Sequence, residues 1–316
     1  MKILANDGIS QSGIDTLKNA GFETITTHVA QEQLVTFINE NQIIGLLVRS
    51  ATQVGKDVMD GCPSLKLIGR GGVGMDNIDV VYAKKKGIHI INTPEASSES
   101  VAELVFAHLF GGVRFLYDSN RNMPLEGDSN FNQLKKAYAI GTELKGKTLG
   151  IIGFGKIGQA TAKIALGVGM KVVYYDSDVN SCEVTLQFFD EQKVSFQLIS
   201  TTQTEVLAVS DFITIHVPSQ RDYVLGAEEF AQMKDGVGVV NLARGGVLDE
   251  VALINALESK KVAFAALDVF ESEPKPEIRI LMHPNISLSP HIGAATLEAQ
   301  DRIGLELASQ IIALLK

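Results

Sequence analysis

The chain alternates short apolar, β-branched runs with segments of helical periodicity, and this alternation constrains its fold more than any other feature. Strict alternation of this kind is typical of parallel β-sheets covered by helices on both faces. The pattern occurs before residue 100 and again after residue 148. We therefore predict an α/β protein with two doubly wound parallel-sheet domains. The predicted strands are Ile3–Ala5, Thr24–Thr27, Ile43–Val48, Leu65–Ile68 and His89–Asn92 in the first series, and Thr148–Ile152, Lys171–Tyr175, Phe212–His216, Gly238–Asn241, Ala263–Leu267 and Ile286–Leu288 in the second.

A glycine-rich turn follows the first strand of the second series. In the stretch from 148 to 158, the apolar strand runs into Gly153, Gly155 and Gly158 and then into a helix. This G-x-G-x-x-G setting is typical of dinucleotide binding, because free backbone N–H groups and the helix dipole can hold a pyrophosphate. The three glycines would make the tight turn, admit the phosphates and let the helix pack on the strand, respectively. We therefore predict a Rossmann nucleotide domain.

An acidic residue ends the next predicted strand. Asp176 follows Lys171–Tyr175, about 20 residues after the glycines. A carboxylate at this place can accept hydrogen bonds from both ribose hydroxyls of NAD, and it would repel the 2′-phosphate of NADP. The sequence therefore favours NAD as the cofactor.

Three other segments place charged residues after predicted strands. Arg244 and His291 each follow an apolar run directly, and Glu273 follows a third run by six residues. The carboxyl ends of strands are where open α/β sheets collect ligands. Hydride transfer to a 2-keto acid needs a cation for the substrate and a proton donor for the developing alkoxide. Alone, an Arg such as Arg244 is more often a salt-bridge residue, and a His such as His291 is more often a structural one. Beside a dinucleotide motif, the set favours an oxidoreductase.

Composition argues against several other classes of protein. The chain has 316 residues, more than one hydrophobic core usually holds, so two domains are expected. A formal net charge of −9 without a basic block argues against nucleic acid as a partner. The two cysteines, Cys62 and Cys182, form no CxxC pair, which favours a reducing cytoplasm and indicates neither a metal site nor a disulfide framework. No signal peptide or membrane-length apolar run is evident.

Across nearly its whole length the sequence resembles the D-2-hydroxyacid dehydrogenase family, and within it the short phosphoglycerate-oxidising branch without a regulatory domain. The resemblance implies an NAD-dependent oxidoreductase acting on a small anionic 2-hydroxy or 2-keto acid, with 3-phosphoglycerate, a precursor in serine biosynthesis, as the favoured substrate. The matching stretches are Arg49–Thr52, Gly69–Asp79, Asn92–Pro94, Ser100–Leu104, Gly141–Gly150, Asn241–Glu250, Asp268–Pro274 and Ser289–Gly293.

The resemblance also implies roles for individual residues. His291 would be the acid/base, Glu273 its carboxylate partner, and Arg244 the group that binds and polarises the substrate. A carboxylate beside an imidazole favours the imidazolium form, which suits proton donation to a ketone. Arg49 and Ser50 match phosphate-binding positions, although a surface salt bridge would also explain Arg49. The other implied substrate residues are Gly72, Val73 and Gly74, and the implied cofactor residues are Val101, Gly153, Gly155, Lys156, Ile157, Gly158, Asp176, His216, Pro218, Ala243, Asp268 and Gly293.

The expected domains are a discontinuous, flavodoxin-like substrate domain, residues 1–99 and 290–316, and an NAD-binding domain, residues 100–289. The polar segment Asn120–Asn132 reads as a loop, and residues 177–208 match the family poorly. A homodimer is expected by resemblance only. A glyoxylate or hydroxypyruvate reductase remains an alternative, since it would share the catalytic residues. An NAD-sensing corepressor that acts by binding partner proteins remains another.

Overall fold

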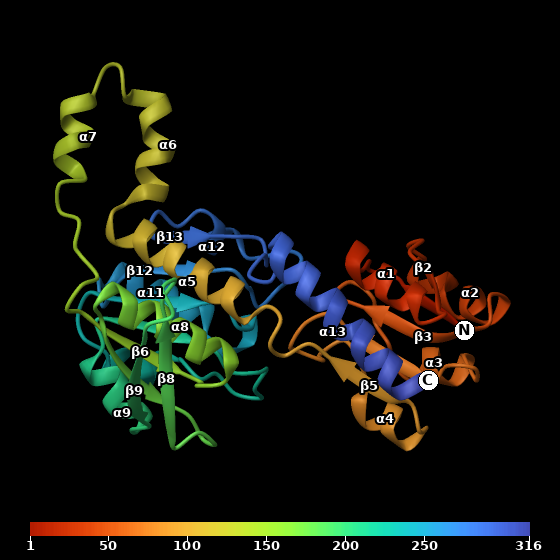
Figure 1. Cartoon of the computed structure of the whole chain (residues 1–316). Helices are drawn as coiled ribbons and strands as arrows, with labels where there is room; N and C mark the ends of the chain where they lie inside the picture. The colour runs from red at the N-terminus through yellow and green to blue at the C-terminus, as the bar shows by residue number, and fades with distance from the viewer. The chain divides into compact units, whose positions relative to one another are not determined.

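The computed structural model describes all 316 residues and divides them into two compact units (Figure 1). The first unit is Met1–Ser100 with Ala294–Lys316, and the second is Val101–Gly293. The second division follows residue 293, whereas the sequence analysis placed it after residue 289. The physical reason is that the backbone N–H groups of Ile292 and Gly293 donate hydrogen bonds to Asp268, which lies within the second unit.

The first unit is a five-stranded parallel sheet in the order β2-β1-β3-β4-β5. Its elements are β1 (Lys2–Ala5), α1 (Gln11–Asn19), β2 (Glu23–Ile25), α2 (Leu34–Glu40), β3 (Ile43–Val48), α3 (Lys56–Gly61), β4 (Leu67–Arg70), α4 (Val80–Lys85), β5 (His89–Asn92) and α13 (Leu297–Leu315). Ile3 and Ala5 pack in the apolar cluster with α1 and α13, and Leu4 packs in the opposite cluster with α2, α3 and α4. The alternation along β1 therefore serves a sheet with two covered faces.

The second unit contains a six-stranded parallel sheet in the order β13-β12-β11-β10-β6-β7. The strands of this sheet and the helices that pack on it are α5 (Ser98–Val113), β6 (Thr148–Ile152), α8 (Lys156–Val168), β7 (Lys171–Tyr175), α9 (Gln203–Val209), β10 (Phe212–Ile215), α10 (Ala227–Gln232), β11 (Val237–Asn241), α11 (Glu250–Glu258), β12 (Val262–Leu267), α12 (Ile278–Leu281) and β13 (Ile286–Leu288). Ile151 and Val240 pack with α5 and α8 on one face, and Ile152 and Val239 pack with α9 to α12 on the other. The predicted doubly wound fold is confirmed for both sheets.

The segment that follows α5 is helical, so the predicted loop at 120–132 is wrong. It forms α6 (Leu116–Glu126), a short turn and α7 (Phe131–Ala137), an arm that extends away from the sheet of the second unit (Figure 1). Tyr138 holds the arm together, because its hydroxyl donates to Asp118 and accepts from Asn122, both at 2.8 Å. The polar composition of the segment had indicated a loop. No single helix of the chain meets the length and hydropathy criteria for a membrane span, although α5 and α6, bent by 56°, meet them jointly.

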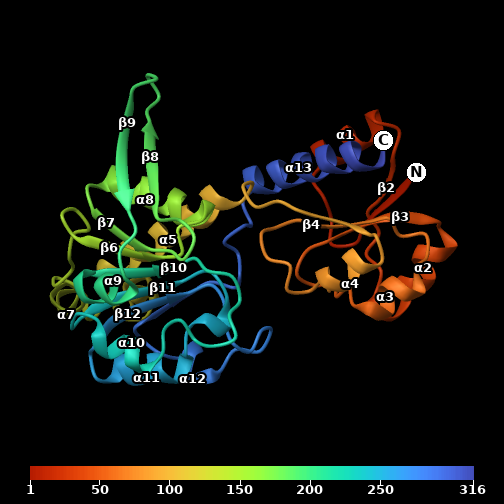
Figure 2. The same ribbon diagram turned by 90° about the horizontal axis from the view of Figure 1, so that it is seen from below.

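The poorly matching segment after β7 forms an antiparallel hairpin of β8 (Ser181–Gln187) and β9 (Lys193–Ile199). The hairpin stands out from the second unit in Figure 2. One face is apolar throughout, and near the base of this face Val184 is buried in the same cluster as α8. At the tip, Phe188 and Phe189 are exposed. The local alternation of apolar and polar residues thus serves a hairpin outside the main sheet.

Candidate active site

The glycine turn between β6 and α8 has the shape that a bound pyrophosphate requires. Gly153 adopts a φ of 92°, and a Cβ there would lie 2.5 Å from the carbonyl oxygen of His216. A Cβ on Gly158 would lie 2.3 Å from the carbonyl oxygen of Gly153, so only glycine lets the helix pack this closely. Gly155 begins α8 without a side-chain cap, and a Cβ there would meet no atom within 4 Å. Open space and uncapped N–H groups therefore coincide at Gly155, where Lys156 and Ile157 form the first turn of α8.

Asp176 lies directly beside this turn. One carboxylate oxygen accepts the N–H of Phe154 at 2.5 Å, and the other accepts the N–H groups of Asp178 and Val179 at 2.8 and 2.9 Å. Burial alone would raise the pKa of Asp176, but these three backbone donors outweigh it and lower the pKa. The carboxylate is therefore charged at neutral pH and fixed next to the glycine turn, as binding of an unphosphorylated ribose requires.

The turn after β10 contributes a neutral histidine. His216 Nε2 lies 3.1 Å from the Thr214 hydroxyl and 3.3 Å from the Thr161 hydroxyl, while Nδ1 is buried without a partner. Desolvation lowers the pKa of His216 to about 3, so the ring is uncharged at neutral pH. Pro218, two residues on, is exposed. The Thr161 contact places the His216 ring against α8, the helix of the nucleotide motif, and the His216 N–H donates to the Ile152 carbonyl of β6 at 2.7 Å.

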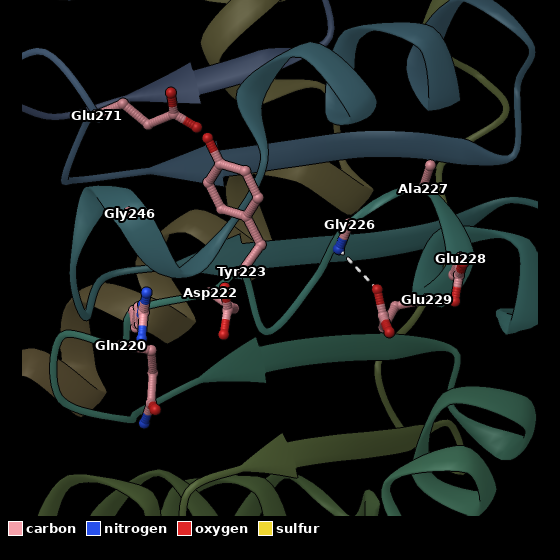
Figure 3. Close-up of a pocket in the computed structure, with 10 residues that line it drawn as sticks. Gln220, Asp222, Tyr223, Gly226, Ala227, Glu228, Glu229, Gly246 and Glu271 are labelled. Carbon is pink, nitrogen blue, oxygen red and sulfur yellow. Dashed lines mark hydrogen bonds between the residues drawn. The ribbon is translucent and has the colours of Figure 1, made fainter.

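A surface pocket of the second unit lies farther along the same segment (Figure 3). The Tyr223 side chain points toward the carboxylate of Glu271, whose charge is the main cause that raises the pKa of Tyr223. An anionic hydroxy acid would be repelled here, because the pocket presents more carboxylates than cations. The pocket is therefore a poor candidate for the substrate site. Its charged lining residues are Arg221, Asp222, Glu228, Glu229 and Glu271.

The side chains of His291 and Glu273, for which the resemblance implied an acid/base and its carboxylate partner, lie in direct contact. Nδ1 of His291 lies 2.8 Å from Oε2 of Glu273, and the two side chains are 42% and 37% exposed. The other oxygen of Glu273 accepts the N–H of Phe270 at 3.0 Å, which orients the carboxylate. A carboxylate only accepts, so Nδ1 carries the proton and Nε2 is left for exchange with a ligand. His291 has a φ of 55°, an uncommon value for a residue with a side chain.

Asp268 anchors the loop that carries His291. Its carboxylate is 1% exposed and accepts hydrogen bonds from the Ser289 hydroxyl at 2.6 Å, the Ile292 N–H at 2.9 Å and the Gly293 N–H at 2.8 Å. A Cβ on Gly293 would lie 3.2 Å from this carboxylate and 3.3 Å from Val101, so a larger residue would crowd both. The structure thus gathers Val101, Asp268 and Gly293 as predicted, and it gives Asp268 a holding role that the sequence analysis missed.

Arg244 follows β11 at the same edge of the sheet. Asn241 shapes its turn: the amide oxygen accepts the Ala243 N–H at 3.0 Å, and the amide nitrogen donates to the Arg244 carbonyl at 2.8 Å. The Arg244 guanidinium donates to the Ala243 carbonyl at 2.6 Å and is half-buried. The sequence analysis did not assign this turn-shaping role to Asn241, although an Asn at the end of a buried strand is a turn signal.

The predicted substrate residues of the first unit lie on two adjoining loops. Asp7 accepts the Arg49 N–H at 2.6 Å and the Thr52 hydroxyl at 2.7 Å, and Asn77 donates to the carbonyls of the same two residues. A Cβ on Gly71 would lie 3.7 Å from Cγ of Arg49, so the loop of Arg49 and Ser50 adjoins the glycine loop.

The glycine loop itself is held at both ends. The Asn92 amide donates to the Val73 carbonyl at 2.8 Å, and the Arg70 guanidinium donates to the Gly74 carbonyl. Gly72 has a φ of 152°, which favours glycine at that position. The first unit thus brings together all five of its predicted substrate residues: Arg49, Ser50, Gly72, Val73 and Gly74.

Comparisons with known proteins agree with this geometry. The family described as the NAD-binding domain of D-isomer specific 2-hydroxyacid dehydrogenases matches residues 106–293. A hydroxypyruvate reductase of Thermotoga maritima is 41% identical, over 98% of this chain and 97% of its own. A D-3-phosphoglycerate dehydrogenase of Methanocaldococcus jannaschii is 39% identical over 98% of this chain, which spans only 57% of that relative. A solved structure from Thermus thermophilus has a TM-score of 0.83 and 28% identity, and the alignment covers 100% of this chain and 97% of its own. The chain is thus an NAD-dependent dehydrogenase of the D-isomer-specific 2-hydroxyacid dehydrogenase family.

Proposed function

We propose that the chain oxidises 3-phosphoglycerate to 3-phosphohydroxypyruvate, a reaction that would serve serine biosynthesis. The observation that carries this proposal is Arg49, whose side chain makes no salt bridge and whose Cγ lies beside Gly71 of the glycine loop in the same unit. The loop would receive the substrate carboxylate through backbone N–H groups, and Arg49 with Ser50 would bind the phosphate. An uncommitted cation near an anion-binding loop suits a substrate with negative charge at both ends.

His291 would exchange the proton of the substrate hydroxyl. Glu273 holds Nδ1, so the neutral ring presents the lone pair of Nε2 to that hydroxyl during oxidation. When the proton arrives, the carboxylate beside Nδ1 stabilises the imidazolium, and the reverse reaction returns the proton to the keto oxygen. Arg244 would bind the C2 oxygen and the carboxylate, and its cation would stabilise the alkoxide character that develops at C2.

NAD supplies the hydride acceptor in this chemistry. The open space at Gly155 and the first turn of α8 fit its pyrophosphate, and the charged Asp176 fits an unphosphorylated ribose. Val101, Ala243, Asp268 and Gly293 would line the nicotinamide side.

Reduction of hydroxypyruvate or glyoxylate is the second candidate. The observation in its favour is that a hydroxypyruvate reductase of Thermotoga maritima is 41% identical to this chain, whereas the phosphoglycerate dehydrogenases of Synechocystis and Methanocaldococcus jannaschii are 35% and 39% identical. The two candidates share the catalytic groups and differ in whether a phosphate must be bound.

Replacing Arg49 separates the two candidates. For Arg49→Ala we expect the Michaelis constant for 3-phosphoglycerate to rise by about 10- to 100-fold, the size of a lost charge-assisted contact, while that for unphosphorylated glycerate changes little. Initial rates of NADH formation with both acids give the ratio. Equal effects on the two acids would refute the phosphate role and favour the reductase.

We also propose a cytoplasmic homodimer. The α6–α7 arm and its flanks carry exposed apolar side chains that a second copy could cover. The two free thiols support a reducing compartment. The exposed apolar residues are Phe110, Leu116, Met123, Leu125, Phe131 and Ile140.

A further inference from the structure

A buried chain of polar side chains runs behind the loop that carries His291. It begins on α5 with His108, which is 6% exposed in an otherwise apolar helix face. Nδ1 of His108 lies 2.8 Å from the Ser287 hydroxyl, and Nε2 lies 3.0 Å from the Ser289 hydroxyl. Ser289 in turn lies 2.6 Å from Asp268. Every polar atom of the His108 ring therefore has a partner.

The direction of each hydrogen bond in this chain follows from its Asp268 end. The Ser289 hydroxyl donates its one proton to Asp268, so its oxygen accepts the Nε2–H of His108. A neutral imidazole carrying its proton on Nε2 has an acceptor at Nδ1, which takes the Ser287 hydroxyl. Burial lowers the pKa of His108, which keeps the ring in this neutral form.

The same carboxylate fixes the chain on both sides of His291. Ser289 lies two residues before it, and the Ile292 and Gly293 N–H groups that bind Asp268 lie directly after it. Between these anchors His291 has a φ of 55°, which persists only where the surroundings impose it. The orientation of the imidazole toward Glu273 thus depends on where Asp268 sits.

We propose that His108 is a positioning residue for the dehydrogenase reaction. It orients the Ser289 hydroxyl, which holds Asp268, which holds the backbone around His291. This inference rests on the proposed acid/base role of His291. A polar side chain in the core is costly unless all its groups are paired, and here the pairing ends at the loop of the proton-transferring residue.

Replacing His108 tests the proposal. For His108→Leu we expect kcat to fall by about 10- to 100-fold, the penalty of a small misplacement of a reacting group, with a much smaller change in the dissociation constant of NAD. The primary isotope effect measured with C4-deuterated NADH should rise, because a slower chemical step controls more of the rate. His108→Gln keeps one donor and one acceptor and should remain within about threefold of the wild type.

His283→Leu is the matched control, because the His283 side chain accepts a hydrogen bond from the N–H of Asn285 and makes none to the chain that leads to Asp268. Its kcat and isotope effect should match the wild type. Thermal melting of each variant identifies any that fails to fold. Should His108→Leu fail, Ser289→Ala breaks the same chain one step nearer to Asp268 and should give the same loss in kcat.

A double-mutant cycle separates the proposal from a diffuse structural effect. Because both residues act through Asp268, His108→Leu and Ser289→Ala together should lose little more than either alone. Additive losses, or a His108→Leu enzyme with wild-type kcat and isotope effect, would overturn the positioning role. If His291→Ala instead keeps its activity, the acid/base assignment itself has failed.

Discussion

Single residues in the glycine turn differ in what an added side chain would meet. At Gly153 and Gly158 a Cβ would strike backbone carbonyls, so substitution there disturbs the fold. At Gly155 a Cβ would meet open space, and φ is −67°, which any residue adopts. Substitution at Gly155 therefore changes only the volume that the account assigns to the pyrophosphate.

Gly155→Ala should raise the dissociation constant of NAD by about tenfold or more, because the methyl group occupies the phosphate volume, while the melting temperature stays unchanged. Gly167→Ala is the matched control, since its Cβ also meets open space, at the other end of α8. Titration with NAD, followed by fluorescence or calorimetry, gives the dissociation constant of each variant. Equal affinity in the two variants would place the pyrophosphate elsewhere.

Glu250 predicts a pH dependence of stability. Its side chain is 5% exposed, one oxygen accepts the Glu271 N–H at 2.9 Å, and the other is buried without a partner. Burial raises the pKa of Glu250 in the folded state, so folding favours the protonated form. The stability that this group contributes is fully present below the unfolded-state pKa and is lost as pH rises through the folded-state pKa.

Glu250→Gln removes this ionisation and keeps an oxygen for the Glu271 N–H. We therefore expect it to raise the melting temperature at pH 8 relative to the wild type and to have less effect at pH 4.5. Melting curves across that range provide the measurement. If Glu250→Gln lowered the melting temperature more at pH 8 than at pH 4.5, the predicted direction of the pH dependence would be wrong.

The elements show where sequence patterns succeed and where they fail. β3, β5, β6, β7 and β13 have the predicted bounds, because each is a short segment whose apolar residues pack within a sheet covered on both faces. β4 begins two residues late, at Leu67, since Leu65 is held in a turn by the carbonyl of Cys62. The α6–α7 arm was missed because the polar composition of residues 120–132 indicated a loop, whereas contacts from Tyr138 hold the two helices together.

The β8–β9 hairpin supports a prediction at this scale. Val184→Ala should lower the free energy of unfolding by about 1–3 kcal/mol, since Val184 is buried at the hairpin base against the core of the second unit. Phe189→Ser should leave stability unchanged, because Phe189 is fully exposed. Urea unfolding measures both. A stability loss in Phe189→Ser equal to that in Val184→Ala would mean that the tip is covered.

Over the whole molecule, the predicted substrate-binding and catalytic residues are divided between the two units. Arg49 and the glycine loop gather in the first unit, and Arg244, Glu273 and His291 follow strands of the second. The strand pattern predicted that these residues lie at the carboxyl ends of strands. The pairing of Glu273 with His291, 18 residues apart, came from the family resemblance. The buried chain from His108 escaped prediction, because nothing in the sequence indicates which hydroxyls a lone histidine on a helix will meet.

The central claim is that His291, oriented by Glu273, transfers the proton. The most direct test is the steady-state rate of His291→Ala with whichever of phosphoglycerate, glycerate, lactate and 2-hydroxyglutarate the wild type oxidises fastest. We expect kcat to fall by about 10²- to 10⁴-fold, the usual contribution of a positioned acid/base, with NAD affinity and melting temperature retained. A kcat within about twofold of the wild type would contradict the account.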